Sequence, residues 1–242
     1  MMMHSKINPI LFRLNRKEIP QAEMFKSCWF TTNKKKFKDA VEDDLIINWA
    51  INTFFENTPF SYYRIKRFFP SVLIIEIYTP ALGSLIGQKA VTLIKFKEML
   101  NSISTFKKIE VQFFVSKKTA HYLAQIIKLE LVKGVGAWVK QVRNVLRQLH
   151  IEQGSNLLGY KIQVTGRING SEKTKQRIFR EGAMPLHTLE SNVDYAMLPA
   201  ITNSGSVSVK VWICTKERII RFKNKLDDLD ITKQVKKLDY EK

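Results

Sequence analysis

The stretch GRINGSEKTKQRIFREGAMPLHTL (residues 166–189) gathers basic side chains, glycines, a proline and a histidine within two dozen positions. Two alternating segments lie on either side of it, LGYKIQVTGRI (residues 158–168) and SVSVKVWIC (residues 206–214). In both segments apolar residues occupy every second position, which is typical of a strand with one face in a hydrophobic core. The pattern predicts a sheet with a polar, basic outer face. A catalytic loop around His187 is the competing interpretation.

Basic side chains dominate residues 157–182, where six of them stand against two acidic ones. They are Lys161, Arg167, Lys173, Lys175, Arg177 and Arg180. If the run is extended, the spacing of two at Lys173, Lys175 and Arg177 places these three along one side, about 6.6–6.8 Å apart. Arginine can hold a phosphate with paired hydrogen bonds, and lysine adds a point charge. We expect this region to bind phosphates in a salt-dependent manner.

The chain as a whole is strongly basic. Its 242 residues include 40 Lys and Arg against 22 Asp and Glu, which gives a formal charge of +18, while 45% of the residues are hydrophobic. This excess makes nucleic acid the first partner to consider and an anionic membrane surface the second. The longest apolar run, SVLIIEIY (residues 71–78), contains Glu76 and is far too short for a membrane span. Two cysteines, Cys28 and Cys214, support neither a disulfide framework nor a four-ligand zinc site.

Catalytic and metal-binding signatures are missing from the sequence. The four histidines include no pair at the i, i+4 spacing of a helical zinc site, and there is no Walker A loop or GxSxG elbow. The segment GVGAWV starts like a dinucleotide fingerprint, but it follows a predicted helix and lacks the third small residue. His187 has no nearby Ser or Cys with an orienting partner. We therefore expect no enzymatic activity, no metal site, no cofactor and no small-molecule substrate.

The N-terminal half predicts the order helix, strand, strand, glycine loop, helix, strand. In the first helix, at residues 36–56, Phe37, Val41, Leu45 and Trp49 recur at every fourth position as an apolar stripe. The remaining segments are β-rich runs at residues 60–69 and 71–79, a helical run at residues 91–100 and a strand at residues 108–115. Pro70 marks the turn between the first two strands.

The glycine loop GSLIGQKA (residues 83–90) resembles the G-x-x-G turn with which KH domains bring an RNA backbone close to the peptide. Gly83 and Gly87 bracket its first half. Gly87 would be the first glycine of the motif, and Ala90 stands where the second is expected. Gln88 and Lys89 lie between them, so only one of the two central residues is charged.

Residues 117–151 predict two helices. Their apolar stripes are Ala120, Leu123, Ile127 and Leu131 in the first, and Val139, Val142, Leu146 and Leu149 in the second. On the second helix Lys140, Arg143 and Arg147 share a face turned away from the stripe. Such a row is usually a solvated face, but it can also follow a phosphate backbone. Before the first helix, INPILFRL (residues 7–14) is predicted to be extended because Pro9 restricts Asn8.

Several segments together resemble a known family. VTGRINGSE (residues 164–172), REGAMPLHTLESNVDYA (residues 180–196) and VSVKVWI (residues 207–213) are similar to the C-terminal domain of the small-subunit ribosomal protein S-three family. SKINPILFRL (residues 5–14), Trp29–Phe30 and TPALGSLIGQKA (residues 79–90) resemble its N-terminal part. The resemblance covers about residues 5–215 and leaves the tail unexplained. Near residues 134–148 the sequence differs from the family, because it lacks the paired arginines found there.

The resemblance implies an α+β fold made of a type II KH domain followed by a small α+β C-terminal domain. The expected divisions are an N-terminal arm at residues 1–35, the KH domain at 36–116, the C-terminal ribosomal domain at 117–215 and a charged tail at 216–242.

The implied function is that of a structural constituent of the small-subunit head, with no membrane partner. Lys6 and Arg13 of the arm are expected to contact rRNA. Gly83, Gly87, Gln88 and Lys89, together with Lys140, Arg143 and Arg147, would face mRNA at the entrance. The rRNA anchor, which also meets neighbouring head proteins, would comprise Lys161, Arg167, Lys173, Lys175, Arg177, Arg180 and His187. Two alternatives are a free-standing KH regulatory protein and a nucleic-acid-processing enzyme.

The resemblance also suggests a location. Its opening NPI…RL is closest to the mitochondrial branch, and it begins at Ser5, which leaves almost no room for a cleaved import peptide. The composition favours Lys, Ile, Phe and Asn, as AT-rich genomes tend to do. We expect a mitochondrial ribosomal protein encoded in the organelle.

Overall fold

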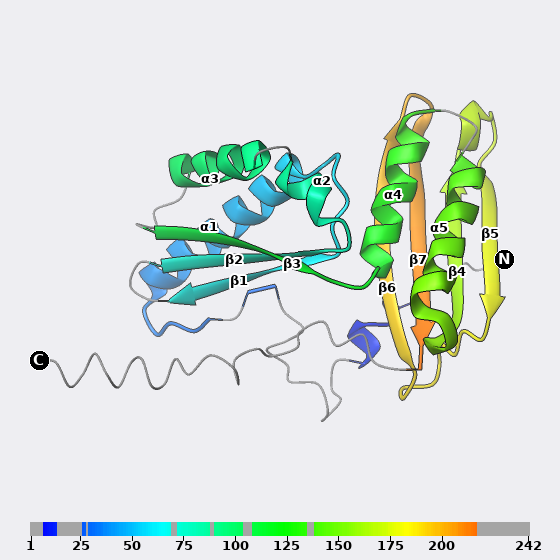
Figure 1. Cartoon of the computed structure of the whole chain (residues 1–242), viewed down its shortest axis with the longest axis horizontal. Helices are drawn as coiled ribbons and strands as arrows, with labels where there is room; N and C mark the ends of the chain where they lie inside the picture. The colour runs from blue at the N-terminus through cyan, green and yellow to red at the C-terminus, as the bar shows by residue number, and fades with distance from the viewer. Residues whose placement is uncertain are drawn as a thin grey trace, which may run out of the picture.

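The computed structural model describes residues 7–13, 26–27, 29–68, 72–87, 90–103, 108–134 and 138–216. The helices are α1 (Lys34–Phe54), α2 (Leu82–Ile86), α3 (Val91–Ile103), α4 (Ala120–Val132) and α5 (Trp138–Gln153). The strands are β1 (Tyr62–Phe68), β2 (Val72–Thr79), β3 (Lys108–Val115), β4 (Leu157–Gly166), β5 (Lys175–Gly182), β6 (Asn192–Thr202) and β7 (Gly205–Thr215). Short 3-10 turns lie at Leu11–Arg13, Gly154–Asn156 and Ile168–Gly170. Figure 1 shows that these elements form two groups, each built around its own sheet.

The first sheet has the order β1-β2-β3, with β1 antiparallel and β3 parallel to β2. Helices α1 and α3 cover one face of it (Figure 1), and a cluster of aromatic side chains fills the space between them, including Phe55, Phe60 and Phe96. The predicted α+β order is confirmed here, and β3 has the predicted bounds. The sequence analysis missed α2, because this five-residue helix has no side-chain cap and is too short to show a period.

The apolar stripe predicted for α1 is wrong. Phe37, Leu45 and Trp49 are exposed, whereas the helix buries Ala40, Ile47, Ala50 and Ile51. The predicted stripe stepped by four residues, and each such step turns about 40° around a helix with 3.6 residues per turn. The stripe therefore winds away from the sheet, while the buried residues stay on one side.

The second sheet is antiparallel throughout, in the order β5-β4-β7-β6. Helices α4 and α5 lie side by side over one of its faces (Figure 1). The predicted inward positions on β4, β7, α4 and α5 are confirmed, since almost all of them are buried in one cluster and Val139 is partly buried against it. Residues 183–191 lie beyond β5, and Met184 and Leu186 pack against Trp212 and Cys214 in a smaller cluster.

Contacts at the start of α4 join the two groups. The Asp194 carboxylate of β6 accepts a hydrogen bond from the Ala120 backbone N–H at 2.7 Å, which ties the first turn of α4 to the second sheet. From the other side, the Gln125 side-chain oxygen accepts from the Phe60 N–H at 2.7 Å. His121 lies 3.2 Å from the Phe60 carbonyl oxygen. One helix is thereby fastened to both sheets.

Within the described residues, no helix combines the length and the apolar character that crossing a bilayer requires. Cys214 is buried, and burial raises the pKa of its thiol. Cys28 lies outside the described residues.

Candidate nucleic-acid interface

Helix α5 presents its basic face to solvent. Lys140, Arg143 and Arg147 are exposed, and the opposite side of the helix buries Val142 and Leu149 against the sheet. Within the part of the chain that the structure describes, none of the three cations forms an ion pair. The structure thus brings the predicted row together on one accessible surface.

The predicted anchor residues divide between the two faces of the β4–β5 hairpin. Lys175 and Arg177 share the face of β5 that is turned toward α5, as their neighbour Phe179 shows by packing against Trp138 with ring centroids 6.0 Å apart. Lys161 and Arg180 are cross-strand partners on the opposite face. The Lys161 ammonium lies 5.0 Å from the centroid of the Trp212 ring, so a cation–π contact holds its position.

Lys173 does not continue the row formed by Lys175 and Arg177, contrary to the expectation of one extended run. Strand β5 begins at Lys175, and Lys173 lies in the bend before it, where its carbonyl oxygen accepts a hydrogen bond from the Ser171 hydroxyl. Arg167 stabilises the same turn by donating from Nε to the Ser171 carbonyl at 2.9 Å. Both side chains remain exposed beside the hairpin.

Arg13 corrects the prediction of an rRNA contact in the arm. Its side chain is buried, with 5% exposed, and its Nη2 lies 2.8 Å from the Thr188 carbonyl oxygen. The guanidinium also donates to the carbonyl oxygens of Pro9, Pro185, Leu186 and Ser191. A group used in this way has little capacity left for a phosphate. Its role is to fasten the arm to residues 185–191.

The arm is also not extended as predicted. It forms a 3-10 turn at Leu11–Arg13, because the Asn8 side chain accepts from the Ile10 N–H at 2.9 Å and supports the turn locally. His187 of the fastened segment is exposed. The prediction for Lys6 falls outside the described residues.

The glycine loop lies between two helices, α2 and α3. Gly83 is inside α2, and Gly87 ends that helix with a positive φ of 72°. Ala90 has a φ of 57°, which is the left-handed conformation that a glycine would adopt with less strain. Gln88 and Lys89, at the tip, fall outside the described residues.

One acidic side chain of the hairpin, Glu181, is held by neighbouring groups. Glu181 of β5 accepts a hydrogen bond from the Tyr160 hydroxyl at 2.6 Å, and its carboxylate lies 3.5 Å from the His150 ring of α5. The hydrogen bond from Tyr160, followed by the charge of His150, lowers the pKa of the Glu181 carboxyl. Burial and the hydrogen bond to Glu181 raise the pKa of Tyr160. Glu181 therefore stays ionised, and the positive excess of the hairpin comes from its six basic residues against two acidic ones.

Among the described residues, no group of three or more His, Cys, Asp and Glu side chains is arranged to hold a metal ion. The sequence analysis also overlooked Trp138, whose indole is buried beside Lys175 and Arg177. A tryptophan next to a basic helix face is a signal for base recognition, but a tryptophan at the start of a helix is more often simply part of the core.

Comparisons with known proteins give a consistent result. A family profile described as "Ribosomal protein S3, C-terminal domain" matches residues 128–213. The "Small ribosomal subunit protein uS3" of Methylacidiphilum infernorum is 33% identical over 218 residues, which is 90% of this chain and 98% of that protein. The uS3c protein of Guillardia theta is 31% identical over 222 residues, covering 89% and 97% respectively. The uS3 protein of Clavibacter michiganensis is 30% identical over 87% of this chain.

Proposed function

The chain belongs to the family of the small ribosomal subunit protein uS3, and from this membership we propose that the β4–β5 hairpin is its anchor on rRNA. The chain is a structural constituent of the small ribosomal subunit and has no enzymatic role. Its partners are therefore small-subunit rRNA and other ribosomal proteins.

One observation carries the anchor proposal: a rigid sheet edge displays cations on both of its faces. Lys175 and Arg177 lie on the helix side of β5, and Lys161 and Arg180 lie on the other side. Because β4 and β5 are joined by a continuous antiparallel register, the backbone positions that carry these charges are fixed before RNA arrives. A backbone that is already ordered loses little conformational entropy on binding, which favours tight association with a folded polyanion.

We propose further that residues 36–116 form a type II KH domain, as expected from the sequence, whose loop meets the message. In support, the element order is helix, strand, strand, helix, helix, strand, and the segment from Gly87 to Ala90 lies between the two central helices. Lys89 would supply the charge at its tip. The remaining divisions of the chain stay as predicted from the sequence.

The exposed row on α5 is the second surface proposed for the mRNA entrance. Lys140, Arg143 and Arg147 are unpaired among the described residues and occupy one face of a helix that is buried on its other side. Such a row can hold a single strand by its phosphates and so favour the opening of a message hairpin.

We assign the chain to a mitochondrial ribosome. Its opening segment, its altered glycine loop and its Lys-, Ile-, Phe- and Asn-rich composition support this, while its relatives include bacterial and plastid forms. Immunoblots of purified organelles test the assignment. Detection in plastids or cytosol alone would reject it.

The anchor is tested by replacing Lys173, Lys175 and Arg177 together with Ala and following a tagged chain on sucrose gradients. The expected result is a clear loss from the small-subunit peak. A matched control replaces Lys34, Lys35 and Lys36 with Ala, which removes the same charge from the exposed start of α1. Equal incorporation of both variants would argue against the anchor. A wild-type chain found mostly at the top of the gradient would favour a free-standing RNA-binding protein instead.

The entrance role is tested by replacing Lys140, Arg143 and Arg147 with Ala in ribosomes that translate messages with folded or unfolded leaders. We expect a lower yield from the folded leader only. The same ribosomes with the α1 control variant should translate both leaders normally. An equal loss of translation yield from both leaders would show that α5 does not act in unwinding the message.

A further inference from the structure

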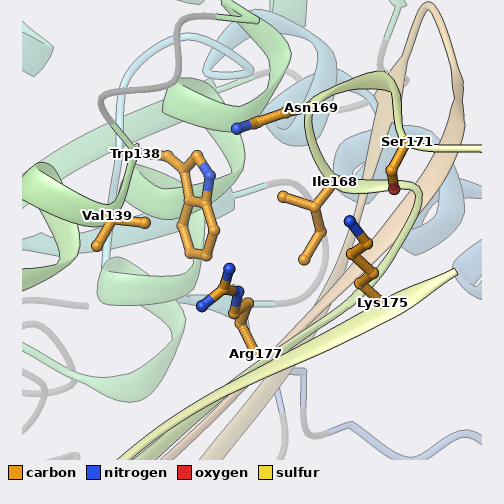
Figure 2. Close-up of a pocket in the computed structure, with 7 residues that line it drawn as sticks. All are labelled: Trp138, Val139, Ile168, Asn169, Ser171, Lys175 and Arg177. Atoms are coloured by element: carbon orange, nitrogen blue, oxygen red, sulfur yellow. The ribbon is translucent and has the colours of Figure 1, made fainter.

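A cavity of about 290 Å³ opens between the start of α5, the turn after β4 and the start of β5. Its walls are of two kinds, as Figure 2 shows. Trp138, Val139 and Ile168 provide apolar surface, and Lys175 and Arg177 extend cationic side chains toward the space. Pockets that bind small molecules have volumes from about 300 Å³ upward, so this cavity has room for one small chemical group and no more.

Trp138 is the residue that most strongly indicates a ligand for this cavity. Its side chain is buried, with 2% exposed, yet its indole N–H has no hydrogen-bond partner among the described residues. Figure 2 shows the indole nitrogen on the side of the ring that faces Ile168 and Asn169. Buried N–H groups are nearly always paired in proteins, so an unpaired donor aimed into a cavity indicates an acceptor supplied from outside.

The surroundings of Trp138 hold its ring in place. Phe179 packs edge-on against it at 6.0 Å between centroids, and the ring belongs to the same core cluster as Ile168. At the rim, Asn169 adopts a left-handed conformation with φ 55° and ψ 36° and lines the same cavity. The cavity lining therefore includes two groups that can donate hydrogen bonds, the indole N–H and the Asn169 amide.

The cations at the other side can hold an anion between them. Lys175 and Arg177 are two residues apart on one face of β5, both are exposed, and neither forms an ion pair within the described part of the chain. Two cations without an acid repel each other, and a phosphate between them would remove the repulsion. An apolar wall, paired hydrogen-bond donors and a phosphate clamp together match the parts of a nucleotide.

We propose that this cavity receives one unpaired nucleotide of RNA. The base packs beside Val139 and Ile168 at the edge of the Trp138 ring, an acceptor on its own edge takes the indole N–H with help from Asn169, and its phosphate lies between Lys175 and Arg177. The inference rests on the proposed rRNA anchor and adds to it a preference for RNA with an extruded base. A regular duplex could reach the two cations through its backbone, but its stacked bases could not enter the cavity.

The test compares two RNA duplexes that differ only by one bulged nucleotide, bound to the full chain at one salt concentration and measured by fluorescence anisotropy. The bulged RNA should bind at least about fivefold more tightly, since one added hydrogen bond in a buried site contributes at this level. With 2-aminopurine as the bulged base, binding should also change its fluorescence, because the base would leave the solvent and enter the cavity.

Trp138→Phe keeps an aromatic ring and removes the donor, so it should weaken binding of the bulged RNA by about threefold or more and leave the paired RNA unchanged. Trp49→Phe, on the exposed face of α1, is the matched control and should change neither affinity. Should Trp138→Phe fail to fold, Asn169→Gly replaces it, because glycine accepts the backbone conformation at that position. It should lower the preference for the bulge about twofold.

The outcomes separate this inference from the anchor. Equal wild-type affinity for the two RNAs overturns the nucleotide site but leaves the anchor standing. A preference for the bulge that neither Trp138→Phe nor Asn169→Gly reduces also overturns it. Failure to bind either RNA, together with absence from the small-subunit peak, overturns both.

Discussion

Arg13 shows how one side chain can hold a terminal arm. Its guanidinium reaches carbonyl oxygens in residues 185–191 as well as that of Pro9, and it is almost fully buried. Lysine has a single charged nitrogen and cannot match this spread of acceptors. Arg13→Lys should therefore leave partly buried carbonyls, such as that of Leu186, without this donor and lower the free energy of unfolding by about 1–3 kcal/mol.

Chemical denaturation of the full chain measures this change. Arg167→Lys is the matched control, because Arg167 is exposed and makes one described backbone contact, at Ser171. The control should shift the free energy of unfolding by no more than about 0.5 kcal/mol. Equal effects of the two substitutions would show that Arg13 does not fasten the arm.

Glu181 should make part of the hairpin's stability dependent on pH. Its pKa is lowered in the folded chain, mainly by the hydrogen bond from Tyr160 and then by His150. A lowered folded-state pKa means that the contribution is present above the ordinary carboxyl pKa and is lost as pH falls through the lowered value.

Tyr160→Phe removes the hydroxyl that lowers this pKa. The stability difference between wild type and Tyr160→Phe should accordingly be larger at neutral pH than near about pH 3. Thermal unfolding at a series of pH values measures it, and NMR titration of Glu181 should show a higher carboxyl pKa in the variant. An unchanged Glu181 titration would contradict the assignment to Tyr160.

For single residues, the sequence showed which side chains carry charge, but it was a poorer guide to where those side chains lie in the structure. The exposed cations of α5 and the hairpin were predicted because Lys and Arg at regular spacings can be read directly. The burial of Arg13 was not, since most of its acceptors are backbone groups 172–178 residues away and carry no side-chain signal. Trp138 was missed for a similar reason, because the Lys and Arg beside it come from a different element.

Among the elements, the connection from α2 to α3 depends on its first glycine. A Cβ on Gly87 would clash with the Thr92 hydroxyl oxygen, and the backbone there has a φ of 72°. Gly87→Ala should therefore destabilise the chain by about 1–2 kcal/mol. Gly83→Ala is the control, because Gly83 lies within α2 and its Cβ would meet nothing within 4 Å.

The control should be neutral or stabilising by up to about 1 kcal/mol, since alanine favours helix more than glycine does. Thermal unfolding of the two variants compares them directly. Similar effects at both positions would mean that the positive φ of Gly87 is not a constraint on this connection.

Predictability differed between strands and helices for a geometric reason. A period of two admits only two choices of face, so the alternation in β4 and β7 identified the buried side correctly. A helix offers many faces, and in α1 small residues such as Ala40 and Ala50 took the buried positions where closer packing was possible. Because alanine is only weakly hydrophobic, Ala40 and Ala50 did not stand out in the sequence, whereas the exposed Leu45 and Trp49 did.

The whole molecule carries a charge that should oppose its own folding when RNA is absent. With a formal charge of +18, the isolated chain is subject to self-repulsion, which dissolved salt screens. Raising KCl from about 0.05 to 0.5 M should increase its Tm by a few degrees. Calorimetry without RNA measures this shift.

A charge-reduced variant provides the comparison. Lys34, Lys35 and Lys36 are exposed at the start of α1, where the helix dipole favours negative charge and no acidic residue is present in the first turn. Replacing the three with Glu should raise the Tm at low salt and reduce its dependence on KCl. A Tm that falls with salt in both proteins would show that attractive surface pairs outweigh the repulsion.

At the scale of the whole chain, the sequence analysis anticipated the α+β class and the family through a long specific match at residues 164–213. It could not anticipate how α4 fastens the two sheets, because the contacts of Asp194 and Gln125 join backbone groups that no pattern in the sequence reveals.

The contact between Arg13 and Ser191 spans 178 residues, and this separation has a consequence for biosynthesis. A nascent chain grows by roughly 5–20 residues per second, so Arg13 must wait roughly 9–36 s before Ser191 is made. The amino-terminal segment therefore cannot close before residues 185–191 have been made. The guanidinium acts as a latch that only a chain grown past Ser191 can fasten.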